Sequence, residues 1–164
     1  MKVERWMLVL LLSAMAVQSI YYYPQLPPTL ASQFDGRGQP NGWVSKDSFF
    51  SLHAGLLVLM TLVFFIAPPM LFRLRLPWIN LPNKGYWMAV GRRAETIAFL
   101  EKQLCWFGCA TLLFGFCIVQ FVIHTNLAEG RAFSNNTFRF ILGPYLAFTA
   151  VWTVRLVLRF FRTG

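Results

Sequence analysis

The chain has 164 residues, of which 57% are hydrophobic and only 13% are charged. In globular proteins about a quarter of all residues are charged. A chain this short cannot bury so much apolar surface in one water-soluble core. The composition therefore excludes an ordinary soluble domain and predicts an integral membrane protein. The formal net charge of +9 does not call for nucleic acid as a partner, because membrane topology and anionic lipid account for it.

Four segments are apolar enough to cross a bilayer, which takes roughly 20 residues, or about 17 at the short limit. The fourth is short by that measure, and it spans if Arg155 and Arg159 extend their side chains to the interface. The expected fold class is an all-α integral membrane protein with four transmembrane helices, forming a single membrane domain over residues 1–164. The predicted spans are residues 6–23, 48–72, 103–128 and 138–158.

Basic residues are divided unevenly between the two sides that these spans define. Eleven of the 15 Lys and Arg residues lie on the side of the termini and of loop 73–102, and four lie on the other side. Because short basic loops stay in the cytoplasm, both termini and loop 73–102 are expected to be cytoplasmic. The loop at residues 24–47 then faces outward.

A cleaved signal peptide is the alternative interpretation of the first segment. Lys2 and Arg5 would supply its charged region, and Ala14-Met15-Ala16 fits the small-x-small cleavage pattern. Apolar and aromatic residues continue beyond that point to residues 21–23, as they do in a membrane anchor with an aromatic belt. Retention as the first span is therefore the favoured interpretation.

The outer loop at residues 24–47 is rich in proline, glycine and aromatic residues. Its prolines stiffen the exit from the first helix, and stretches 35–38 and 40–42 contain the residue types of tight turns. Ser45 or Ser48 is placed to cap the second helix. The loop is predicted to be ordered, either as a cap over the bundle or as a binding surface.

On the other side, Pro68-Pro69 is expected to kink or end the second helix. From Gly91 onward the pattern predicts a helix that leads directly into the third span. That span contains three cysteines without a CxxC pair, together with small residues that favour close helix packing in lipid. A structural packing role is predicted for this set: Cys105, Gly108, Cys109, Thr111, Gly115 and Cys117.

Catalytic chemistry has little support in the sequence. His53 and His124 fall near the outer ends of their predicted helices, but no HExxH or comparable ligand spacing accompanies them. Serine nucleophile motifs, phosphate-binding loops and paired catalytic carboxylates do not occur in the sequence. We therefore expect no catalytic residue, no metal ligand and no cofactor.

Two sequence patterns resemble a known group of proteins. The first is Phe34-Asp35-x-x-Gly38-Gln39-Pro40-Asn41-Gly42-Trp43-Val44-Ser45-Lys46, and the second is Asn80-Leu81-Pro82-Asn83-Lys84-Gly85-Tyr86-Trp87 followed by Arg92-Arg93-Ala94-Glu95. Both are similar to a bacterial membrane domain of unknown function that also forms the N-terminal part of SdpI-type toxin-immunity proteins. The resemblance covers residues 20–100. The chain departs from the group at Gln33, where members often carry His, and at Asn41, where they often carry Asp.

The resemblance implies a non-enzymatic protein of the bacterial cytoplasmic (inner) membrane that acts in immunity or sensing. Its partners would be the lipid bilayer and an envelope-active ligand, such as a peptide toxin, or a membrane protein. The expected binding residues are Gln33, Phe34, Asp35, Gly38, Asn41, Gly42, Trp43 and Lys46. The cytoplasmic signature consists of Asn83, Tyr86, Trp87, Arg92, Arg93 and Glu95. An accessory or scaffold subunit of a larger membrane complex is the alternative function, and a membrane enzyme with a site near His53 and His124 is the third.

Overall fold

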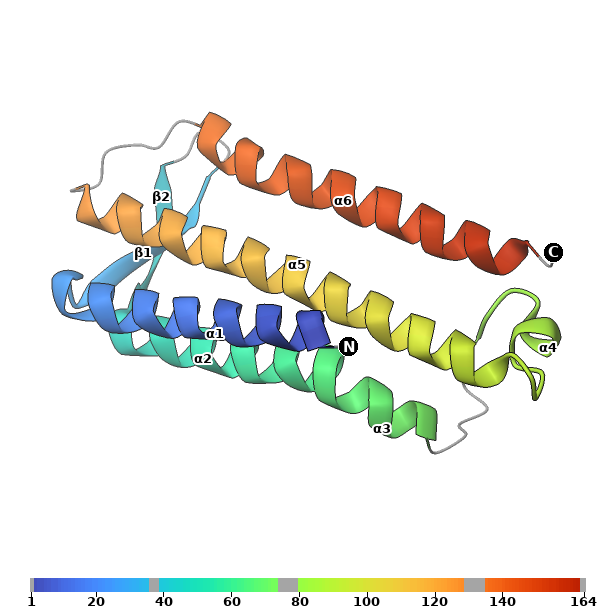
Figure 1. Cartoon of the computed structure of the whole chain (residues 1–164). Coiled ribbons are helices and arrows are strands. Elements are labelled where there is room, and N and C mark those ends of the chain that lie inside the picture. The colour runs from blue at the N-terminus through green and yellow to red at the C-terminus, as the bar shows by residue number, and fades with distance from the viewer. Residues whose placement is uncertain (1, 36–38, 74–79, 129–134, 163–164) are drawn as a thin grey trace.

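The computed structural model describes residues 2–35, 39–73, 80–128 and 135–162. Within these ranges, long helices run side by side, a two-stranded sheet lies at one end of the molecule, and a short helix lies at the other (Figure 1). We call the end with the two-stranded sheet the hairpin end and the end with the short helix the α4 end. In chain order the elements are α1 (Lys2–Tyr22), the 3-10 turn η1 (Tyr23–Gln25), β1 (Thr29–Phe34), β2 (Pro40–Ser45), α2 (Lys46–Thr61), the π-helical turn η2 (Leu62–Ile66), α3 (Ala67–Arg73), α4 (Lys84–Trp87), α5 (Arg93–Leu127) and α6 (Asn135–Phe161).

The helical prediction is confirmed in its main features. Helices long and apolar enough to cross a membrane cover Val3–Gln25, Lys46–Phe72, Arg93–Leu127 and Arg139–Phe161. By length and composition the chain is therefore a multi-pass membrane protein, and α5 leads directly into the third span as expected. The prediction of an all-α fold needs one correction, because part of loop 24–47 forms two β-strands.

α5 is the central helix of the molecule. α1, the continuous α2–α3 segment and α6 all pack against it (Figure 1), and its buried residues extend from Thr96 to Thr125. α6 instead leaves many large apolar side chains exposed, among them Phe140 and Val154. Lipid tails are as apolar as these side chains, so the exposed faces suit contact with a bilayer.

The second spanning helix is irregular where it approaches Pro68 and Pro69. Proline has no N–H, so Pro68 cannot bond to the carbonyl of Phe64 four residues earlier. The helix widens here into the π turn, in which the Ala67 N–H bonds to the Leu62 carbonyl. It then continues as α3 to Arg73. The prolines therefore disturb the helix, but they do not end it.

Two cysteines of the third span contact backbone carbonyls of neighbouring helices. The Cys105 thiol contacts the carbonyl oxygen of Phe64 at an Sγ–O distance of 3.9 Å, which supplies a weak donor to the group that Pro68 leaves unbonded. The Cys109 thiol contacts the Glu4 carbonyl of α1, also at 3.9 Å. All three cysteines are free thiols. The packing role predicted for Cys105 and Cys109 is confirmed.

Candidate functional site

The loop predicted at residues 24–47 folds largely as an antiparallel β-hairpin between α1 and α2. The Asp35 carboxylate accepts a hydrogen bond from the Gln39 N–H at 2.9 Å, and the Asp35 N–H donates to the Gln39 carbonyl at 2.9 Å. These two bonds close the strands near the tip. Gly38, a predicted site residue, lies outside the described residues. Cross-strand neighbours farther from the tip are Thr29 and Ser45, Leu30 and Val44, and Ala31 and Trp43.

A single side chain of α5 holds the outer edge of β1. Asn126 accepts a hydrogen bond from the Ala31 N–H at 2.8 Å through Oδ1, and its Nδ2 donates to the Ala31 carbonyl at 3.0 Å. The same Nδ2 also donates to the Val122 carbonyl at 2.8 Å, which orients the amide. Asn126 thus pairs with β1 much as a neighbouring strand would, and it fixes the hairpin on the central helix.

A small apolar core lies beneath the hairpin. Leu30 and Leu26 are buried against Val119 and Ile123 of α5, with Tyr22, Phe49, Phe50 and Leu127 around them. Phe34 is half-buried and packs edge-to-face on Phe121 at a centroid distance of 5.7 Å. Burial of side chains on this face gives the hairpin a defined register. Phe34, predicted as a binding residue, therefore serves to dock the hairpin.

The start of α2 is tied to the end of α1 by polar contacts. Ser45 caps α2, accepting the Ser48 N–H at 3.1 Å, as predicted from the sequence. Lys46 donates from Nζ to the Leu26 carbonyl at 3.3 Å, and its ammonium lies 4.4 Å from the ring centroid of Tyr23. The Tyr23 hydroxyl in turn donates to the Asp47 carboxylate. Lys46, another predicted binding residue, is thus engaged inside the fold.

The remaining predicted residues lie on exposed parts of the hairpin. Exposure alternates along β2, which puts Asn41 and Trp43 on one face, and the Trp43 side chain is 60% exposed. Gln33 is also exposed and lies against Gly42, since a Cβ added at Gly42 would be 2.7 Å from Gln33 Oε1. We call Asn41, Trp43 and the outer edge of β2 the hairpin surface.

Sequence reasoning missed a set of polar contacts between α1 and α5 near the hairpin end. Gln18 Nε2 donates to Gln120 Oε1 at 2.6 Å, and Gln120 Nε2 donates to the Tyr22 hydroxyl at 3.2 Å. Asn126 lies six residues farther along α5 and bonds to β1, whereas Gln120 bonds to α1. The available signal was the presence of Gln and Asn within apolar spans, because amides in lipid usually bond to a neighbouring helix.

The two histidines occupy different environments. His53 is buried, and no described residue forms a hydrogen bond with its Nε2. His124 is exposed on α5, and its ring centroid lies 6.4 Å from that of Tyr22. Among the described residues, no group of three or more His, Cys, Asp or Glu side chains could hold a metal ion.

At the α4 end, the predicted signature caps the last turn of α6. Asn83 has a left-handed backbone with a φ of 51°, and its Nδ2 donates to the Phe160 and Phe161 carbonyls at 3.2 and 3.1 Å. Trp87 Nε1 donates to the Phe160 carbonyl at 3.1 Å. The last carbonyls of a helix lack hydrogen-bond donors within the helix. The side chains of Asn83 and Trp87 supply these donors.

The other signature residues surround the short helix α4. The Arg92 guanidinium lies 3.9 Å from the ring centroid of Tyr86, and Thr96 Oγ1 donates to the Trp87 carbonyl at 2.9 Å. Arg93 begins α5, and Glu95 is exposed in its first turn. The signature therefore connects α4, α5 and α6, while its predicted role as a site stays a prediction.

Comparison with known proteins gives one family. Residues 8–57 are similar to a family described as a domain of unknown function (DUF1648). The matched segment includes most of α1, the hairpin and the first part of α2. No curated protein and no solved structure matches the chain. The match supports a membrane-type domain of unknown function over this segment, and it takes in the hairpin surface.

Proposed function

We propose that this chain is a non-enzymatic membrane protein that binds an extended segment of an envelope-active peptide or partner protein at the hairpin surface. In this proposal it acts in immunity or sensing, as the resemblance to SdpI-type proteins implies. It resides in the bacterial inner membrane with the hairpin outside. The side of the termini and of loop 73–102 carries most of the Lys and Arg residues, which supports that orientation.

The observation that supports the proposal best is the open edge of β2 beside an exposed tryptophan. Because the Ala31 backbone bonds to Asn126, Ala31 and Trp43 form a non-hydrogen-bonded cross-strand pair. The Trp43 N–H and C=O therefore point away from β1. No other described backbone group bonds to this edge. An edge of this kind adds an extended peptide through main-chain hydrogen bonds, and nearby side chains provide specificity.

The docked hairpin also supports a binding role through its rigidity. Asn126, the buried Leu30 and the Ser45 cap hold both strands in place. A surface ordered before binding loses less conformational entropy on association. Trp43 adds a large amphipathic side chain of the type enriched at binding hot spots.

The test is protection of a sensitive host strain against membrane-active peptide toxins. Trp43→Ala removes the exposed ring, and Trp43→Pro additionally removes the outward N–H at an edge position that tolerates proline. We expect Trp43→Ala to weaken protection and Trp43→Pro to weaken it further. Thr29→Ala, at an exposed position of β1, is the matched control and should protect like the wild type. Equal protection by all three variants would reject the hairpin surface as the binding site.

A second pair of changes distinguishes the binding function from the enzyme interpretation. His53→Gln combined with His124→Gln keeps neutral hydrogen-bonding groups while removing proton and metal chemistry. Protection should survive this double change. Loss of protection in the folded double variant, with the hairpin variants unaffected, would favour an enzyme. A protein that co-purifies stoichiometrically in mild detergent would instead favour the accessory-subunit function.

A further inference from the structure

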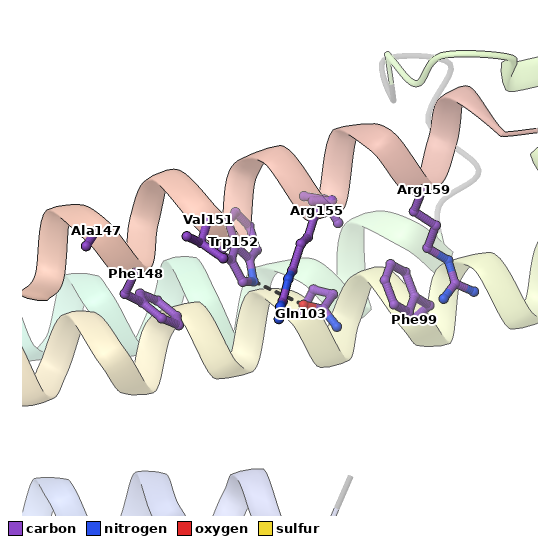
Figure 2. A pocket seen from close by; sticks show the side chains of 9 residues that line it. Phe99, Gln103, Ala147, Phe148, Val151, Trp152, Arg155 and Arg159 are labelled. Carbon is purple, nitrogen blue, oxygen red and sulfur yellow. Dashed lines mark hydrogen bonds between the residues drawn. The ribbon is translucent and has the colours of Figure 1, made fainter.

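A groove between α5 and α6 lies toward the α4 end of the molecule, far from the hairpin. Its volume is about 600 Å³, and its walls include Phe99, Phe148, Val151 and Trp152. Figure 2 shows these side chains between the two helices, with Arg155 and Arg159 toward one end of the row. The groove therefore combines an apolar wall with a basic end.

A second cavity adjoins this basic end. Its volume is about 570 Å³, and it shares Arg155 and Arg159 with the groove while adding Arg162 and Trp87. None of the three arginines forms an ion pair with a carboxylate among the described residues. Their positive charge is therefore available to an anion that enters from the surface.

The geometry of the basic end is set by aromatic contacts. The Arg159 guanidinium carbon lies 3.7 Å from the ring centroid of Phe99 and 6.0 Å from that of Trp87. Stacking of this kind holds the guanidinium plane while leaving its edge donors available for a phosphate. The α6 carbonyls at Phe160 and Phe161 would repel an anion, but side chains of Asn83 and Trp87 already bond to them.

The floor of the groove carries one satisfied polar pair. Trp152 Nε1 donates to Gln103 Oε1 at 3.0 Å, as the dashed line in Figure 2 marks. The indole ring also packs on Phe107, at a centroid distance of 4.6 Å. The pair fixes the Trp152 ring, so the groove is preformed and presents an apolar wall to a chain lying in it.

We propose that this groove binds one anionic glycerophospholipid. An acyl chain lies along Phe148, Val151 and Trp152, and the phosphate lies between Arg155 and Arg159. Lipid suits the groove because α6 is a spanning helix with exposed apolar faces, and basic pockets between spanning helices recognise anionic head groups. A free phosphate would leave the apolar wall unexplained, and a neutral lipid would leave the unpaired arginines unexplained.

The test uses the full chain, purified in detergent and stripped of lipid. Phosphatidylglycerol and phosphatidylcholine with identical acyl chains are titrated in parallel, and bound lipid is counted by native mass spectrometry. Wild type should bind phosphatidylglycerol more tightly. Arg155→Gln with Arg159→Gln should weaken phosphatidylglycerol binding by roughly 30-fold, given the usual contribution of two basic residues near anionic lipid. Phosphatidylcholine binding should change little.

Two further variants decide the outcome. Arg5→Gln with Arg139→Gln removes the same charge from exposed positions outside the groove, and its lipid preference should match that of the wild type. Val151→Trp fills the groove and keeps both arginines, so it should weaken binding of phosphatidylglycerol as well. Val151→Trp therefore still tests the proposal if the double arginine variant fails to fold.

Three results would overturn the proposal. The first is an equal loss of phosphatidylglycerol binding in the groove and control arginine variants, which would mean a general surface-charge effect. The second is undiminished binding in Val151→Trp. The third is displacement of bound phosphatidylglycerol by inorganic phosphate at similar concentrations, which would reveal a site for the anion and not for the lipid.

Discussion

The backbone of Gly108 in α5 lies directly against the side chain of Phe64 in the π turn. A Cβ at position 108 would lie 2.6 Å from Phe64 Cβ and 2.9 Å from Phe65 Cε2, closer than such atoms can pack. The two helices approach as nearly as glycine allows, and the contact lies next to the Cys105–Phe64 bond. Small residues that permit close backbone approach are a common basis of helix association in lipid.

Gly108→Ala is therefore expected to destabilise the protein by about 1 to 3 kcal/mol, the usual cost of overpacking. Gly55→Ala on α2 is the matched control, because nothing lies within 4 Å of its added Cβ. That change should be neutral or stabilise the helix by roughly 0.5 to 1 kcal/mol. Unfolding in detergent micelles with increasing denaturant measures both. A Gly108→Ala protein as stable as Gly55→Ala would contradict the close approach.

Asn126→Ala should loosen the hairpin on α5. It leaves the Ala31 N–H and C=O without their partner, and an unsatisfied buried backbone group costs about 1 to 3 kcal/mol. We expect a lower melting temperature in detergent and faster proteolysis between residues 26 and 46. Gln25→Ala removes an exposed side-chain bond to the Tyr21 carbonyl and should change neither. Unchanged proteolysis in Asn126→Ala would show that the apolar core alone holds the hairpin.

Trp87→Phe tests the cap on the last turn of α6. It removes the indole N–H that bonds to the Phe160 carbonyl and keeps an aromatic ring beside Phe160. The loss should be about 1 kcal/mol, the usual net contribution of one hydrogen bond, and amide hydrogen exchange should rise near Phe160. Equal exchange in variant and wild type would indicate that solvent or lipid satisfies this carbonyl.

Two substitutions of Asn83 separate the cost of backbone strain from the loss of the cap on α6. Asn83→Gly keeps the left-handed conformation but loses the amide, whereas Asn83→Ala loses the amide and is also strained at a φ of 51°. The Ala variant should therefore be less stable than the Gly variant by roughly 1 kcal/mol. Thermal unfolding in detergent gives the comparison. Equal stability of the two variants would argue against a left-handed conformation at this position.

Membrane orientation is tested with single cysteines at Asn41 and Gly85, both exposed in the structure. The parent chain carries alanine at Cys105, Cys109 and Cys117. Given the distribution of basic residues, a membrane-impermeant thiol reagent should label Asn41→Cys in intact cells. Labelling of Gly85→Cys should require permeabilised membranes. The reverse pattern would place the hairpin in the cytoplasm and remove the basis for the proposed function.

Much of the fold follows from local pattern. Apolar runs locate all four spans, because lipid contact requires about 20 consecutive apolar residues whatever their neighbours are. The Ser45 cap and the helix that leads into the third span were also predictable from local pattern, since a cap depends on residues three positions apart. The helix begins at Arg93, two residues after the predicted start at Gly91. Turn chemistry indicated an ordered loop at residues 24–47. It did not indicate strands, because neither strand alternates clearly between apolar and polar residues.

Within the candidate site, the sequence located the exposed hairpin residues Asn41 and Trp43, but it could not separate them from Phe34 and Lys46. Those two residues look equally available in the sequence, yet Phe34 packs on Phe121 and Lys46 bonds to Leu26. Only contacts with residues distant in the sequence, Phe121 of α5 for Phe34 and Leu26 for Lys46, make that distinction. The same holds for His53 and His124, whose burial differs although both lie near span ends.

The sequence by itself determined the membrane class, the number of spans and the uneven distribution of basic residues, because these depend on composition and on distances of one helix length. Tertiary structure decided which polar groups meet. Asn126 reaches Ala31 across 95 positions, and Asn83 reaches Phe160 across 77. Such contacts leave no periodicity in the chain, since they arise only when segments far apart in the sequence pack together.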